Sequence, residues 1–481
     1  MKHTTYVCIT IAISFYLLGC SSWNTIPGGT FNRLDATSIN FINEDFPHGL
    51  SELALQSQRP NQKLESTDFL VSTSGGGQRA AAFTMGVLYE LERIGEYSTN
   101  EKLNDARKEI DYFSSVSGGG WATGAYLTAL IEHGKEDSTH FSLNNELMGT
   151  IQNRIQSLEM SLTSNCLVDK LDEKVTSIEG RSIKYGDIFT PKGKTPFLPY
   201  LFNNATIQSS HAPFVFDDGY FAHYQIESFN YCGNSISVNK TLASTPISVG
   251  IATSSSVPGF RFTQAEISLC EGNSELSTSW LCYGDPKYMH LYDGGVYDNL
   301  AYKTGIEILE ESNSLNKVML IVDANADTYQ PIDSTSRSSE WKMLLDAGIK
   351  SSLAVNALTA QRAIHRQSES AGISTIILGF YSASDFIRQS KKIRKSTGKD
   401  PLEGLDALKK FVEVDSKNDR LLCDYSRDDN IDCKDNQYYR IGLSSETSHK
   451  IGDKYYKAIQ ELGRLVVRLN SDKISEFLLA Q

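Results

Sequence analysis

The chain has 481 residues, of which 40% are apolar and 22% are charged, and its formal net charge at pH 7 is −12. This length fits one large α/β domain or two to three smaller ones, and the apolar share is sufficient for a hydrophobic core. The negative charge argues against a general nucleic-acid-binding protein, because neutralising phosphates requires a basic surface, so we expect no nucleic-acid partner.

The first residues have the features of an export signal. A positive start at Lys2 precedes an almost wholly apolar run over residues 6–18, which is short for a membrane span. The run ends in Leu17-Leu18-Gly19-Cys20, which resembles the bacterial lipobox, where cleavage precedes a cysteine that is then lipid-modified. We therefore predict a lipoprotein signal peptide over 1–19 and a lipidated Cys20. The alternative is an ordinary signal peptide cleaved after Gly19.

The residues after Cys20 bear on location. Ser21 and Ser22 follow, with no aspartate beside the cysteine. By resemblance to known sorting rules, this favours the outer membrane over retention at the inner membrane. The expected location is therefore the bacterial cell envelope, with the protein lipid-anchored at the outer membrane.

Cysteine usage agrees with export. Beyond Cys20 there are six cysteines: Cys166, Cys232, Cys270, Cys282, Cys423 and Cys433. An even number in an exported chain predicts disulfides. Short spacing favours Cys270 with Cys282 and Cys423 with Cys433, which leaves Cys166 for Cys232, although six cysteines allow fifteen pairings. A zinc site is the competing interpretation, but the chain has no CxxC pair and no nearby histidine cluster.

Polar, irregular sequence over 20–62 predicts a tether, and a catalytic domain is expected over 63–335. Strands are predicted at 69–72, 112–114, 247–251 and 318–322, with helices over 82–91 and 122–130. Strands that alternate with helices favour an α/β fold with a mostly parallel sheet and helices on both faces. Long helices are predicted over 339–366 and 451–470, so 336–481 is expected to be a helical part packed on the same body.

Ser117 is the candidate nucleophile, within Ser115-Val116-Ser117-Gly118-Gly119. A strand leads in and a helix of small residues leads out, and a serine on such a sharp turn projects its hydroxyl from the sheet edge. The crowded turn requires small neighbours, which Ser115 and Gly119 provide, although the usual pattern has glycine where Ser115 stands. Taken alone, the segment is also compatible with a plain glycine-rich turn.

A glycine loop follows the first predicted strand as Ser74-Gly75-Gly76-Gly77-Gln78-Arg79. Backbone N–H groups at the start of a helix can bind an oxyanion, and glycine allows a substrate to approach the backbone. A Walker loop is excluded because no Gly-Lys-Ser/Thr follows, and a dinucleotide fingerprint fits poorly because its last glycine is missing.

Asp293 closes an apolar segment, 289–292, and begins Asp293-Gly294-Gly295-Val296-Tyr297-Asp298-Asn299. An aspartate at a strand end, followed by two glycines, is open to a neighbouring loop. The same residues are typical of an ordinary Asp-Gly turn. Asp293 is therefore a candidate catalytic residue only in combination with the other two segments.

The three segments, in this order, resemble the patatin-like phospholipase family. Two further pieces add to the resemblance: 202–206 is similar to the family's Asn-Ala-Thr segment, and 252–259 to its Ala-Ser-x-Ala-x-Pro segment. The similarity spans about residues 66 to 325. The resemblance implies a three-layer α/β/α sandwich around a mostly parallel sheet and a catalytic Ser–Asp dyad.

Carried to this chain, the resemblance implies that Ser117 attacks an ester carbonyl and Asp293 accepts its proton. Gly75, Gly76, Gly77 and Arg79 would form the oxyanion hole; Ala80 replaces a common glycine. No cofactor and no metal is implied. Because a lone aspartate is a weak base in water, Asp293 must be partly desolvated, with a raised pKa. His211, His223 and His290 are expected to be structural.

The expected function is hydrolysis of acyl esters of phospholipids or lysophospholipids at a membrane. The alternatives are an esterase for small non-membrane esters and a catalytically silent scaffold lipoprotein. A basic run over 388–399 is either a solvated face or a contact with a membrane surface. The segment from Asp428 to Asp432 is only weakly similar to a calcium loop.

Overall fold

The computed structural model describes residues 67–100, 102–133, 142–158, 166–189, 198–224, 226–231, 234–238, 241–257, 265–269, 287–325, 360, 363–418, 438, 441 and 451–480. All of them belong to one compact unit, Gly49–Gln481. The predicted signal peptide, Cys20, the tether and the Asp428 segment lie outside the described residues, as does most of the helix predicted over 339–366.

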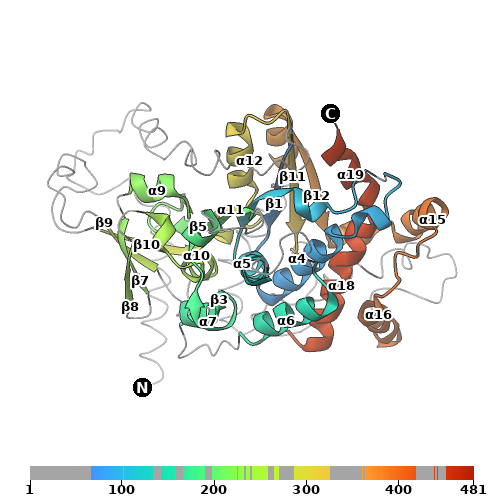
Figure 1. Ribbon diagram of the computed structural model, residues 1–481, viewed down its shortest axis with the longest axis horizontal. Coiled ribbons are helices and arrows are strands. Elements are labelled where there is room, and N and C mark those ends of the chain that lie inside the picture. Colours follow the sequence, from blue (N-terminus) through green and yellow to red (C-terminus); the bar gives the residue numbers. More distant parts are fainter. Residues whose placement is uncertain are drawn as a thin grey trace, which may run out of the picture. The chain divides into compact units, whose positions relative to one another are not determined.

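The centre of the fold is a ten-stranded mixed sheet with the order β12-β11-β1-β2-β5-β10-β9-β7-β8, in which β6 also pairs with β5 (Figure 1). The parallel half consists of β12 (Ile373–Gly379), β11 (Asn316–Asp323), β1 (Thr67–Thr73), β2 (Ile110–Ser115) and β5 (Tyr200–Ile207). The antiparallel half adds β6 (Pro213–Val215), β10 (Lys287–Asp293), β9 (Ala265–Leu269), β7 (Ile226–Tyr231) and β8 (Asn234–Ser237). A separate hairpin pairs β3 (Ser177–Ile178) with β4 (Arg181–Ser182).

Helices cover both faces of the parallel half. Leu70 and Met319 lie against Gly305 of α12 (Tyr302–Glu311) on one face. Phe113, whose side chain points to the other face, packs edge-on against Tyr126 of α5 (Gly118–His133). Successive side chains of a strand point to opposite faces, so this alternation separates the layers. The fold is the predicted α/β sandwich with a mostly parallel core.

Further helices surround this centre. They are α4 (Gly77–Leu91), α6 (Asn145–Gln156), α7 (Leu167–Lys174), α8 (Tyr185–Phe189), α9 (Asp218–His223), α10 (Ile247–Ser254), α11 (Gly295–Asp298), α15 (Phe386–Thr397), α16 (Asp406–Asn418), α18 (Asp453–Leu469) and α19 (Ser471–Leu479). Of these, α18 packs along α4 (Figure 1). The C-terminal part also supplies β12, a strand that the sequence did not predict.

The predicted strand over 247–251 is wrong, because these residues form the first turns of α10. The whole helix is buried, and it packs against β5, α5 and α7. Since it is buried on every side, its sequence lacks a clear helical periodicity and resembles that of a buried strand. Tertiary packing therefore overrides the β-preference of Ile247, Val249 and Ile251.

Candidate active site

The glycine loop connects β1 to α4 at the C-terminal edge of the parallel strands. Gly76 and Gly77 have φ values of 135° and 61°, which glycine adopts without steric penalty. The loop is held from outside by two hydrogen bonds: Ser74 N–H donates to the Val322 carbonyl at 3.1 Å, and Gly75 N–H donates to the Asn299 carbonyl at 3.0 Å.

Ser117 lies on the turn between β2 and α5, and its backbone has a φ of 50° although it is not glycine. The turn is in direct contact with the glycine loop, because a Cβ on Gly118 would lie 2.1 Å from the Gly77 carbonyl oxygen. Gly119 N–H also donates to the Ser74 carbonyl at 3.1 Å. The nucleophile turn and the glycine loop thus form one packed unit.

Asp293 ends β10, where this strand pairs antiparallel with β5. Its carboxylate accepts the Gly295 N–H at 2.7 Å and a hydrogen bond from the Ser117 side chain. Burial raises the pKa of Asp293 to about 7, against the opposing effect of these two hydrogen bonds. The expected desolvated carboxylate with a raised pKa is therefore present, near enough to the Ser117 side chain for that group to lower the pKa.

The four residues predicted for the oxyanion hole occupy different positions. The Gly75 N–H is already bonded to Asn299, so it does not point into the site. Within the part of the chain that the structure describes, the N–H groups of Gly76 and Gly77 have no hydrogen-bond partner. They are unbonded amides at the start of α4, where backbone N–H groups can bind an anion.

The Arg79 side chain lies inside the protein, against the glycine loop. Its side chain is buried, and a Cβ on Gly76 would lie 3.2 Å from one of its terminal nitrogens. It faces Asp323 at the end of β11: burial raises the pKa of Asp323 to about 6, while the Asn325 N–H and the charge of Arg79 oppose this rise. Arg79 therefore supports the loop from within the protein.

Several polar residues that support the site were not singled out from the sequence. Asn204 donates to Ser114 and to the Ser115 carbonyl, just before the nucleophile turn. Ser254 accepts the Ser117 N–H at 3.0 Å. Asn299 donates to Asn325 at 2.7 Å, linking the Asp293 segment to the end of β11. The only sequence signal was their location inside the segments that resemble the family.

No histidine among the described residues takes part in this arrangement. His290 is on β10 with its side chain exposed, and its position three residues before Asp293 places it on the opposite face of the strand. His211 packs edge-on against the ring of Tyr292, with 6.2 Å between ring centroids.

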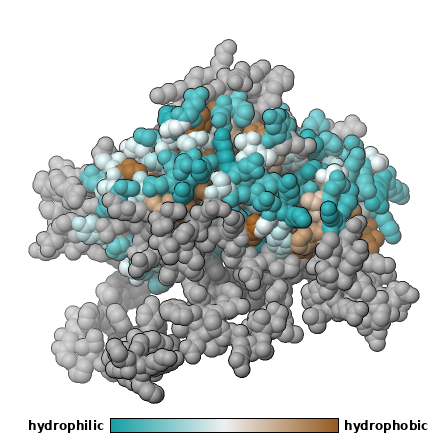
Figure 2. All heavy atoms as spheres, turned by 90° about the horizontal axis from the view of Figure 1, so that it is seen from below, coloured by the Kyte–Doolittle hydropathy of each residue, from teal (hydrophilic) through white to brown (hydrophobic). Residues whose placement is uncertain are grey.

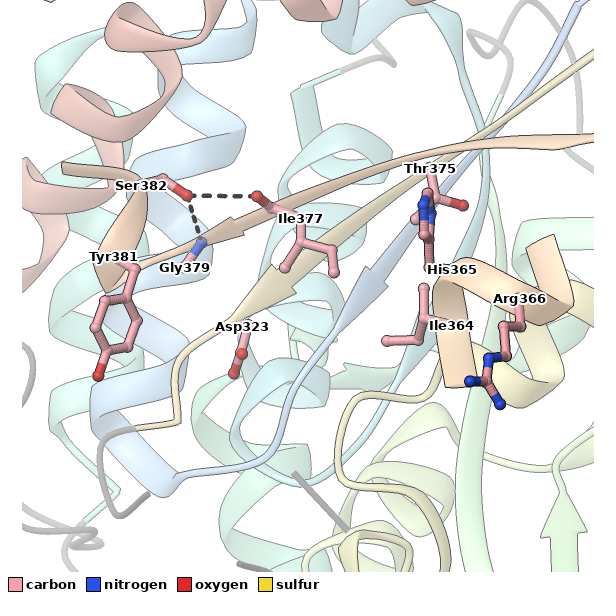
Figure 3. A pocket seen from close by; sticks show the side chains of 9 residues that line it. All are labelled: Asp323, Ile364, His365, Arg366, Thr375, Ile377, Gly379, Tyr381 and Ser382. Carbon is pink, nitrogen blue, oxygen red and sulfur yellow. Dashed lines mark hydrogen bonds between the residues drawn. The ribbon is translucent and has the colours of Figure 1, made fainter. Parts of the chain in front are cut away.

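A cavity of about 560 Å³ lies beside the site, along one face of β12 (Figure 3). Its walls include Thr375 and Ile377 on the strand, His365 and Arg366 on the helical segment 363–370, and Asp323. Neither Ser117 nor Asp293 lines this cavity. It therefore borders the Arg79–Asp323 support of the glycine loop and is separate from the dyad.

Other predictions concern residues around this centre. Cys166 is disulfide-bonded, and the other five cysteines of the predicted pairing lie outside the described residues. Among the described residues, no group of three or more His, Cys, Asp or Glu side chains could hold a metal ion. No described helix has the length and apolar character needed to cross a bilayer.

The basic run lies on and just after α15, and several of its cations are engaged in ion pairs. They are Arg388 with Asp385, Lys392 with Asp472, Arg394 with Asp400 and Lys399 with Glu96. These pairs neutralise much of the positive charge locally, which favours a solvated face over a strongly cationic membrane contact.

A family described as Patatin-like phospholipase matches residues 71–304. No curated protein sequence is significantly similar to the chain.

Among solved structures, human GIVD cytosolic phospholipase A2 is similar with a TM-score of 0.43 and 13% identity, covering 93% of this chain and 67% of that chain. The same human protein in complex with methyl gamma-linolenyl fluorophosphonate gives a TM-score of 0.41 and 12% identity, covering 93% and 64%. The chain thus spans about two thirds of the length of these human structures.

Proposed function

Because the chain belongs to the patatin-like phospholipases, a family of lipid acyl hydrolases, with the family's domain over residues 71–304, we propose that it hydrolyses an acyl ester of phospholipids or lysophospholipids with a Ser117–Asp293 dyad. The single observation that carries the dyad is the buried Asp293 carboxylate, whose pKa burial raises to about 7 and whose charged form the nearby Ser117 side chain favours. A base with this pKa can hold and release a proton near neutral pH.

The chemistry proceeds in two halves. Ser117 Oγ attacks the ester carbonyl while Asp293 takes the hydroxyl proton, and the N–H groups of Gly76 and Gly77 stabilise the oxyanion. Collapse of the tetrahedral intermediate expels the lipid alcohol, which takes the proton from Asp293, and leaves the acyl group on Ser117. Water then attacks the acyl-enzyme, with Asp293 again as base, and releases the fatty acid.

We predict that Ser117→Ala abolishes hydrolysis, because no other group on the turn can form the acyl-enzyme; loss of a nucleophile costs several orders of magnitude in rate. The measurement is fatty-acid release from vesicles of defined phospholipids and lysophospholipids, with a soluble short-chain ester assayed in parallel. Ser157→Ala, at the exposed end of α6, is the matched control and should retain wild-type activity.

The same panel separates the alternatives. Retained hydrolysis in pure Ser117→Ala protein would remove the dyad. Turnover of the short-chain ester alone would replace the lipid substrate by small esters. A wild-type protein that is inactive on the whole panel would support the silent scaffold.

We also propose that Cys20 carries the lipid that anchors the enzyme to the outer membrane of a bacterial envelope. The lipobox-like Leu17-Leu18-Gly19-Cys20 sequence supports this anchor. The described surface gives little hydrophobic alternative: its only exposed large hydrophobic residues are Tyr288 and Leu315, and the face in Figure 2 is mostly hydrophilic where it is coloured. Acyl chains would therefore supply the membrane affinity, at about 0.8 kcal/mol per buried methylene.

We predict that Cys20→Ala, exported by a cleavable ordinary signal, leaves the membrane fraction after a salt wash. Its rate should fall on phospholipid vesicles and stay unchanged on the soluble ester, because only the encounter with the membrane is altered. The measurement is fractionation followed by both assays. A Cys20→Ala protein that stays in the washed membranes would contradict the lipid anchor.

A further inference from the structure

Ser117 has a backbone conformation that needs support from outside its own turn. Its φ of 50° lies in the left-handed region, which residues other than glycine rarely adopt and which persists only where neighbours hold it. Gly118, which follows it, contributes no side chain, and Val116, which precedes it, is fully buried. Contacts from other elements therefore hold the turn, as where the Val116 N–H donates to the Thr73 carbonyl at 3.1 Å.

The Ser254 hydroxyl provides this support at the end of α10. It accepts the Ser117 N–H at 3.0 Å and donates its own proton to the Asn204 carbonyl at 2.5 Å. One buried hydroxyl thus satisfies a donor on the nucleophile turn and an acceptor on β5. Without it, both backbone groups would be left buried and lacking this partner, which is unfavourable.

The same end of α10 also holds the segment of the base. The last carbonyls of a helix have no partner within it, and here they receive donors from the Asp293 loop. Asp293 N–H donates to the Ser256 carbonyl at 2.8 Å, and Gly294 N–H donates to the Ser254 carbonyl at 3.3 Å. The nucleophile and its base are therefore both attached to one short stretch of chain, 254–256.

We propose that Ser254 is a positioning residue whose hydroxyl fixes Ser117 at the distance from Asp293 that proton transfer requires. The proposal rests on the proposed function and deepens it by naming how the dyad is assembled. The Ser254 hydroxyl contacts the turn at the backbone N–H of Ser117. Loss of this hydroxyl is therefore expected to slow the chemical step and to leave substrate binding largely unchanged.

The test combines steady-state kinetics with labelling of Ser117 by a fluorophosphonate, in which Oγ bonds to phosphorus, fluoride leaves and Asp293 takes the proton. For Ser254→Ala we expect kcat and the labelling rate to fall by about 10- to 100-fold, the size of effect that a misplacement near 1 Å produces. KM should change little. The pH profile should shift upward, because the hydrogen bond from Ser117 lowers the pKa of Asp293.

Ser255→Ala is the matched control. Its hydroxyl is equally buried, accepts the Trp121 N–H at 3.0 Å and donates to the Ile251 carbonyl at 2.7 Å, without touching either member of the dyad. It should lose stability yet keep the wild-type pH profile. Ser254→Cys retains a weak donor and acceptor in a similar shape, so it should recover part of the labelling rate. If Ser254→Ala lacks the wild-type circular dichroism spectrum, the labelling rate and pH profile of Ser254→Cys are compared with those of wild type instead.

The outcomes separate this proposal from the function on which it rests. Wild-type protein that neither reacts with the fluorophosphonate nor hydrolyses esters would remove the proposed function. Wild-type protein labelled at Ser117, with a Ser254→Ala variant of equal rate and pH profile, would overturn the positioning role alone. Equal losses in Ser254→Ala and Ser255→Ala would also overturn it, since the effect would then be one of stability.

Discussion

At the scale of single residues, Asp293 combines two properties that oppose each other. Its carboxylate is buried, which raises the pKa to about 7 from 3.8, and it still accepts hydrogen bonds from Gly295 and Ser117. In the proposed mechanism, ionised Asp293 accepts the proton of Ser117. Since its folded-state pKa lies above the unfolded value, its ionisation reduces fold stability progressively as pH rises from about 4 to about 7.

We predict that kcat/KM rises with pH through an apparent pKa near 7 and then levels off, because only the ionised carboxylate can act as base. Asp293→Asn should be nearly inactive at every pH, yet at pH 8 it should unfold at no lower temperature than wild type, since the amide carries no buried charge. The measurements are a pH–rate profile and thermal unfolding. An Asn variant within about tenfold of wild type would point to another base.

At the scale of elements, α4 and α18 approach so closely that glycine is required at the crossing. A Cβ on Gly86 would lie 1.9 Å from the Gln460 carbonyl oxygen, and one on Gly463 would lie 2.3 Å from the Phe83 carbonyl oxygen. This contact matters for the site because α4 begins at Gly77, in the glycine loop.

We predict that Gly86→Ala destabilises the fold by about 1–3 kcal/mol, because the new methyl group forces the two helix backbones apart. Gly149→Ala in α6 is the control: no described residue lies within 4 Å of its Cβ position, so it should stabilise the helix by about 0.5–1 kcal/mol. Denaturant unfolding of both variants measures the difference. Equal stabilities would show that the crossing can adjust.

At the scale of the whole molecule, a buried charge cluster joins α18, near the end of the chain, to α4, the first described α-helix. Glu90 is fully buried in α4 and accepts hydrogen bonds from Arg464 at 2.8 Å and from Arg468 at 2.7 Å, both in α18. Arg468 also donates to the carbonyls of Pro401 and Glu403. Segments more than 370 residues apart in sequence are thereby tied together.

We predict that Glu90→Gln destabilises the protein by about 3–5 kcal/mol, because it leaves the buried Arg468 and the partly buried Arg464 without their counter-charge. Glu132→Gln, which breaks a partly exposed pair with Arg154, should cost about 1 kcal/mol or less. Loss of activity and loss of tryptophan fluorescence on heating should coincide in each variant. Activity that is lost at a much lower temperature than the fluorescence would mean that α18 folds separately from the site.

Elements whose patterns are local could be predicted from the amino-acid sequence. The strands at 69–72, 112–114 and 318–322 and the helices that follow the first two were predicted, because an apolar run next to glycines is a short-range signal. Ser117, Asp293 and the glycine loop were recognised as three segments far apart in the chain, on the strength of their shared resemblance to a family.

The parts that depend on distant contacts could not be predicted without the folded structure. The sequence of α10 resembles that of a strand because the helix is buried on all sides. Strand β12 was not predicted, because it lies in a part of the chain that was expected to be helical. In the structure the Gly75 N–H donates to the Asn299 carbonyl, and the Ser117 N–H donates to the Ser254 hydroxyl. Neither contact could be predicted, because hydrogen bonds across the fold produce no periodic pattern in the sequence. The raised pKa of Asp293 is likewise a property of its surroundings, because burial by other elements creates it.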